Sequence, residues 1–118
     1  MNQNEFVDAI DRIRAADPRF RREAYVFVLA GLEYVVSRLP EPRHITGREL
    51  LDGVAALAKQ QFGMMAPAVF AEWGVPSSTD VGEIVFQLVE AQLLGKRPED
   101  SLRDFENFDL PSALGTGR

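Results

Sequence analysis

Six basic side chains, at the starts of two predicted helices, are the strongest candidates for a site in this sequence. Such side chains bind phosphate and carboxylate groups, and the free N–H groups at a helix start favour the same ligands. If the two groups converge, we expect an anion, phosphate or nucleic-acid site. The alternative is a solvated surface with local ion pairs such as Arg19 with Glu23. The candidates are Arg19, Arg21, Arg22, Arg43, His44 and Arg48.

Residues for catalysis are sparse. His44 is the only histidine, and the chain has no cysteine. One imidazole lacks the companion residues that acid–base catalysis or zinc binding needs, so an ordinary loop histidine is the simpler interpretation. Sequence patterns of hydrolases, metalloproteases and phosphate-binding loops are not found. The sequence predicts no catalytic residue, no metal site and no cofactor, and a protein that is not an enzyme.

An acidic segment near the C-terminus is a candidate contact surface for another protein. Two phenylalanines alternate there with carboxylates, which predicts a strip of mixed apolar and charged character. The alternative is a solvated tail that the two phenylalanines pin to the core. The contact candidates are Asp104, Phe105 and Phe108, among the carboxylates Glu99, Asp100, Glu106 and Asp109.

Met64 and Met65 lie beside Phe62, Phe70 and Trp73 in the sequence. Methionine is flexible and polarisable, so such a pair could form an adaptable binding surface. Core packing is the interpretation that we favour for both methionines.

The elements that would position these residues are mainly helical. Thr46 followed by Glu49 has the spacing of a capping box at a helix start. Prolines and glycines separate the periodic segments, and Asp17-Pro18 and Pro40 each end one. The hydrophobic period predicts helices over 4–16, 19–39, 46–62, 64–73 and 79–94.

The segment 79–94 is predicted to be the core helix because it is apolar around most of its circumference. Asp80 and Glu83 have the spacing of its capping box, and Gly95 stands where a left-handed residue would end it. Its polar residues Glu83, Gln87 and Glu90 fall on one line, which we expect to face solvent.

Length and composition limit the domain organisation, the localisation and the kinds of partner. The 118 residues predict one globular helical domain over 1–110 and a flexible tail over 111–118. Neither a secretory signal nor an apolar run long enough to cross a membrane is visible, which predicts a cytoplasmic protein and no membrane partner. The net charge of −5 arises in the second half of the chain and disfavours nucleic acid.

Residues 46–94 resemble the three-helix core of a winged-helix domain: a helix, a short helix, a turn with Ser and Thr, and a long helix ending in LVEAQLL. Gln92 occupies the place where such helices usually have Gly. We therefore expect a mainly α fold of about five helices, with a short irregular or β-like segment over 102–110. A nucleic-acid-binding regulator is one implied function, although the acidic line of 79–94 would repel phosphates.

Nearly the whole chain, from residue 5 to 110, resembles a family of short uncharacterised bacterial proteins of the Minf type. The resemblance implies no activity, ligand or catalytic residue. It rests on PRFRREAYVFVLAGLEY (18–34), RHITGRELLDGV (43–54), QFGMMA (61–66), EWGV (72–75), DVGEIVFQLVEAQLLGK (80–96) and DSLRDFENFDL (100–110).

These residues do not identify a specific activity. The leading hypothesis is a small non-enzymatic protein-interaction module or adaptor that binds a protein partner or itself. The alternative is a nucleic-acid-binding, winged-helix-like regulator that uses the arginines at the helix starts.

Overall fold

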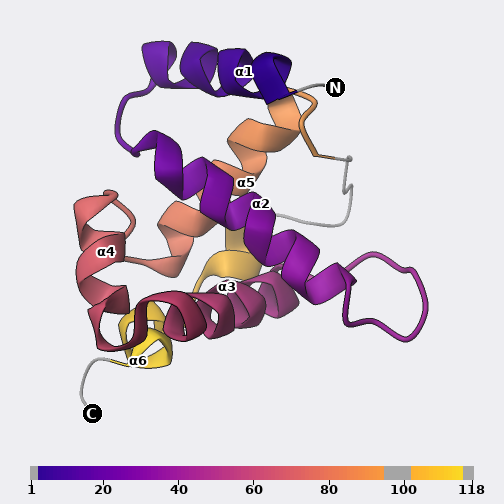
Figure 1. Cartoon of the computed structure of the whole chain (residues 1–118), viewed down its shortest axis with the longest axis vertical. Coiled ribbons are helices and arrows are strands. Elements are labelled where there is room, and N and C mark those ends of the chain that lie inside the picture. The colour runs from indigo at the N-terminus through magenta and orange to yellow at the C-terminus, as the bar shows by residue number, and fades with distance from the viewer. Residues whose placement is uncertain (1–2, 95–101, 116–118) are drawn as a thin grey trace.

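A computed structural model of the chain describes residues 3–94 and 102–115 (Figure 1). It confirms the prediction of a mainly α fold with about five helices. Two short 3-10 turns, Gly63–Met65 and Leu102–Phe105, join the longer elements. The helices are α1 (Gln3–Ala16), α2 (Arg22–Val36), α3 (Gly47–Phe62), α4 (Ala66–Glu72), α5 (Ser78–Glu90) and the short α6 (Leu110–Leu114).

Figure 1 shows α2 lying diagonally across the molecule, with α5 behind it, α1 across one end and α3 along the other. The helices meet in one hydrophobic core, and α5 buries Val81, Ile84 and Leu88 completely, as expected of the core helix. The other helices contribute large side chains to the same core, including Ile10, Phe20, Tyr25, Leu51 and Leu110.

The contact between α2 and α3 is close because each helix has a glycine opposite a valine of the other. Gly31 lies against Val54, and Gly53 lies against Val35. A Cβ on either glycine would overlap the facing valine side chain. Small residues at a crossing let two helix backbones approach and their side chains interdigitate.

The start of α3 confirms the predicted capping box: the Glu49 N–H donates to Thr46 Oγ1 at 3.0 Å, and the Thr46 N–H donates to Glu49 Oε1 at 2.8 Å. The residues predicted to cap the start of α5 were wrong. Its N-cap is Ser77, whose N–H donates to Asp80 Oδ2 at 3.2 Å. The helix therefore starts at Ser78, one residue before the predicted Thr79. Spacing alone does not distinguish the two starts, because Ser77 and Asp80 stand as far apart as the predicted pair Asp80 and Glu83.

The end of α5 also differs from the prediction. The helix ends at Glu90, and Gln92 has a left-handed backbone with φ of 64°. The Leu93 N–H then donates to the Leu88 carbonyl at 2.9 Å, which is the long hydrogen bond of a Schellman motif. Gln92 thus ends the helix in the position where winged-helix patterns have Gly, while the predicted terminator Gly95 lies outside the described residues.

The described C-terminal residues 102–115 contain no strand, so the β-like alternative for 102–110 was wrong and no wing forms there. The flexible tail predicted from residue 111 was also wrong as far as residue 114. Asp109 caps α6 by accepting from the Ser112 N–H at 3.2 Å, and Leu110 and Leu114 are buried where α6 packs on α3. Residues 116–118 lie outside the described part of the chain.

Candidate functional site

The two groups of basic residues do not converge, because they lie at opposite ends of α2. Arg19, Arg21 and Arg22 stand at its start, whereas Arg43 and His44 line a hollow together with residues from its last turns. The 15 residues of α2 separate the groups by about 22 Å. The predicted single anion site is therefore not assembled.

Each arginine at the start of α2 is paired with a carboxylate of another segment. Arg19 Nη2 lies 2.7 Å from Asp17 Oδ2 and 2.5 Å from Glu83 Oε1. Arg21 pairs with Glu72 at 3.0 Å, and Arg22 pairs with Asp11 at 3.0 Å. The local Arg19–Glu23 pair considered from the sequence does not form. The three arginines instead tie α2 to α5, α4 and α1.

A hydrogen-bonded chain runs from α2 through α5 to the segment that joins α1 to α2. The Tyr25 hydroxyl donates to Gln87 Oε1 at 2.6 Å, and Gln87 Nε2 donates to Asp17 Oδ2 at 2.9 Å. Hydrogen bonds from Arg19 hold the pKa of Asp17 below its usual range, and burial raises the pKa of Tyr25 to about 12.

These hydrogen bonds correct the expectation that the polar residues of α5 face solvent. Glu83 and Gln87 are partly buried against the connection between α1 and α2, and only Glu90 of the line is exposed. Two of the three polar residues of this face are thus bound to α2 and to the connection before it.

At the start of α3, Arg43 makes a two-bonded pair with Glu49, at 2.9 and 3.1 Å, and also donates to the His44 carbonyl at 3.0 Å. The hydrogen bonds from Arg43 lower the pKa of Glu49 to about 2. Arg48 lies over the Phe108 ring, 5.1 Å from its centre, as in a cation–π contact. Two of the three basic side chains are thus already engaged within the protein.

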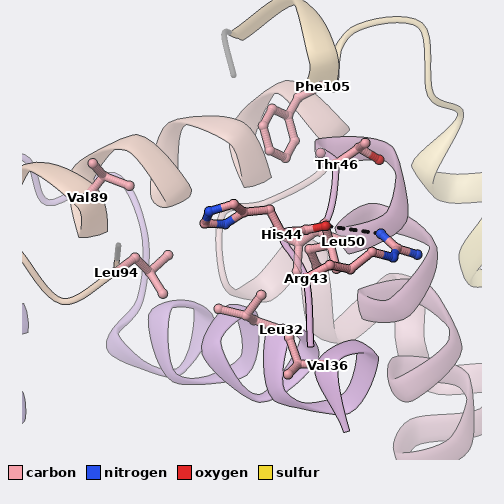
Figure 2. A pocket seen from close by; sticks show the side chains of 11 residues that line it. Leu32, Val36, Arg43, His44, Thr46, Leu50, Val89, Leu94 and Phe105 are labelled. Atoms are coloured by element: carbon pink, nitrogen blue, oxygen red, sulfur yellow. Dashed lines mark hydrogen bonds between the residues drawn. The ribbon is translucent and has the colours of Figure 1, made fainter. Parts of the chain in front are cut away.

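A hollow of about 280 Å³ lies beside this helix start (Figure 2). Figure 2 shows the His44 ring pointing towards Val89 and Leu94, while the Arg43 guanidinium turns away from them. Most other lining residues are apolar, including Leu32, Val36 and Leu50. The hollow therefore offers apolar contacts and one exposed imidazole, and its arginine is neutralised by Glu49.

The C-terminal contact strip predicted from Asp104, Phe105 and Phe108 is corrected by the burial of its centre. Phe105 is only 1% exposed, and its ring packs against Gly82 so closely that a Cβ there would lie 2.7 Å from it. Phe108 is half-buried under Arg48. Asp104 alone of the three is exposed, and the carboxylates at 99 and 100 lie outside the described residues.

A second hollow, of about 370 Å³, opens where the first half of α2 diverges from the end of α3. Four aromatic rings pack beneath and beside it, with neighbouring ring centres 5.5 to 5.7 Å apart. The rings belong to Phe27, Phe62, Phe70 and Trp73. We call this feature the aromatic hollow; it is lined by Arg22, Glu23, Val26, Phe27, Ala30, Gln61, Phe62 and Trp73.

The methionines after Phe62 are exposed, so the prediction that they pack in the core was wrong. Met64 is 95% exposed and Met65 is 62% exposed. Gly63 ends α3 with a φ of 56°, and the following 3-10 turn carries both side chains outward. The sequence allows a binding surface at these methionines as the alternative to core packing, and it places a helix end at Gly63. It does not indicate the hollow between α2 and the end of α3, because no local pattern shows how these two helices diverge.

The chain matches no protein-family model, no curated protein and no solved structure. The resemblances to the Minf-type family and to winged-helix domains therefore stay predictions. Of the helices that the structure describes, none has the length and apolar character to cross a membrane.

Proposed function

We propose that the protein is an interaction module that binds a partner protein through the aromatic hollow and the adjoining methionines. One observation carries this proposal: of the four large apolar side chains that the described residues expose, one lines the hollow and two come directly after its lining residue Phe62 and Gly63 in the chain. They are Val26, which is 47% exposed, and Met64 and Met65; the fourth is Val36.

The composition of this surface suits protein binding. Methionine side chains adapt their shape to a partner, and the packed rings below supply a rigid floor. Exposed apolar groups that adjoin a concave surface are typical of interaction sites. Burying each large side chain would contribute roughly 1.5–3 kcal/mol before the cost of association.

Cross-linking tests this proposal directly. The chain has no cysteine, so a Met64→Cys variant takes a single photoreactive label. In a lysate of the cells in which the chain is native, we expect this variant to give a specific adduct. A Glu41→Cys variant, labelled in the exposed loop before α3, is the matched control and should give none. Equal labelling from both positions, or none from either, would contradict the proposal.

The alternative, a nucleic-acid-binding regulator in the cytoplasm of a bacterium, has weaker support. Four of the five candidate arginines are paired with carboxylates, so phosphate contacts would have to compete with these ion pairs. A gel shift that weakens steeply with salt would favour it over protein binding.

A further inference from the structure

The charges around the aromatic hollow are not balanced. Arg22, on its rim, is paired with Asp11, and the nearby Arg21 is paired with Glu72. Glu23 and Glu33 are exposed on α2, and neither carboxylate is paired with a Lys or Arg among the described residues. The two arginines on this side of the hollow are thus neutralised. Glu23 lines the hollow and Glu33 lies three residues beyond its lining residue Ala30, and both carboxylates are free to pair with a ligand.

These two carboxylates mark the ends of an apolar strip. Glu23, Val26, Ala30 and Glu33 follow one another at helical spacings of three, four and three residues, so they share one face of α2. The strip is about 15 Å long, which equals nearly three turns of a helix. Val26 and Ala30 also line the hollow, so the apolar centre of the strip continues into it.

From this arrangement we propose that the aromatic hollow receives an amphipathic helix of a partner protein, with apolar side chains in the hollow and Lys or Arg side chains against Glu23 and Glu33. The inference rests on the proposed function and specifies its partner. Helices that lie in an apolar groove anchor through side chains on one face, and flanking charges select among them. A second copy of this chain is a poorer occupant because it brings a further net charge of −5.

Three synthetic helical peptides provide the test. They share one apolar face of Leu and Phe, lack Trp, and carry Lys, Gln or Glu at the flanking positions. Calorimetry measures their affinities, and the emission of Trp73, the sole tryptophan, reports contact at the wall of the hollow. We expect the Lys peptide to bind about tenfold more tightly than the Gln peptide, and the Glu peptide to bind most weakly. The preference should shrink in high salt.

Variants locate the charge effect. Glu23→Gln with Glu33→Gln should remove the preference for Lys while leaving the Gln peptide bound. The control, Glu41→Gln with Glu106→Gln, changes the net charge equally at exposed carboxylates elsewhere and should retain the preference. A Val26→Ser variant should weaken the binding of all three peptides.

The outcomes separate this inference from the proposed function. Equal affinity for the three peptides, or a preference lost equally in the control, overturns the role of Glu23 and Glu33 and leaves apolar binding in place. If no peptide binds or changes Trp73 emission, the docking of a helix is overturned. Cross-linking from Met64 then still decides, independently, whether the region contacts any partner.

Discussion

The starts of α2 and α3 each carry three basic residues, yet they are held in different ways. α3 begins with a capping box, and Arg43 pairs with Glu49 six residues later. α2 has no side-chain cap; its Arg21 N–H donates to the Trp73 carbonyl at 3.0 Å, and its arginine side chains reach three other helices or their connections. One helix start is thus stabilised locally and the other by the tertiary fold, which places similar residues under different constraints.

Of the substitutions considered, Gly74→Ala should lower the free energy of unfolding most, because it disturbs the contact between Gly74 and the residues just before α2. Gly74 has a φ of 83°, and a Cβ there would lie 2.6 Å from the Arg19 carbonyl oxygen. Backbone strain and this overlap should lower the free energy of unfolding by at least about 2 kcal/mol, measured by urea denaturation. Gly63→Ala is the control, because its φ is also positive but nothing lies near the added Cβ. Equal losses in both variants would show that the contact with Arg19 is unimportant.

Tyr25→Phe should have the next largest effect. The change removes the hydrogen bond to Gln87 and leaves a partly buried amide oxygen without that donor. We expect a loss of about 1 kcal/mol in the free energy of unfolding. Tyr34→Phe should change it much less, since Tyr34 is less buried than Tyr25. A neutral Tyr25→Phe would mean that the chain from Tyr25 to Asp17 contributes nothing to stability.

Thr46→Ala tests the local support of α3. It removes the side-chain acceptor of the capping box, which typically costs about 1 kcal/mol or somewhat less in an exposed position. Urea denaturation measures the loss, and Thr79→Ala, at an exposed position in the first turn of α5, should cost less. If Thr46→Ala is silent, α3 too must be held mainly by tertiary contacts.

The smallest expected effect concerns the pH dependence of Glu49. Its pKa in the folded protein is about 2, below its usual 4.5, because Arg43 and the Thr46 N–H bind the carboxylate. The ionised form therefore stabilises the folded state above pH 4.5, and this contribution is lost as the pH falls towards 2. The difference in melting temperature between the wild type and Glu49→Gln should shrink over that range. A constant difference from pH 7 to pH 2 would contradict this assignment.

The same contrast explains how much the sequence could predict. The helices and the Thr46–Glu49 cap were predictable because they depend on residues a few positions apart. The Tyr25–Gln87–Asp17 chain joins residues up to 70 positions apart, and no local pattern indicates it. The burial of Phe105 likewise depends on the space above Gly82, which only the packed fold defines. The separation of the two arginine groups follows from the length of α2, which lies between them in the chain.

The paired glycines at the crossing of α2 and α3 have a consequence for both hollows. Gly31 lies between Val26 and Ala30, which line the aromatic hollow, and Leu32 and Val36, which line the hollow near His44. The two hollows therefore lie on opposite sides of the point where α2 and α3 cross. Since each glycine receives a valine from the other helix, sliding along the helix axes is blocked, and a change in the angle between α2 and α3 would alter both hollows at once.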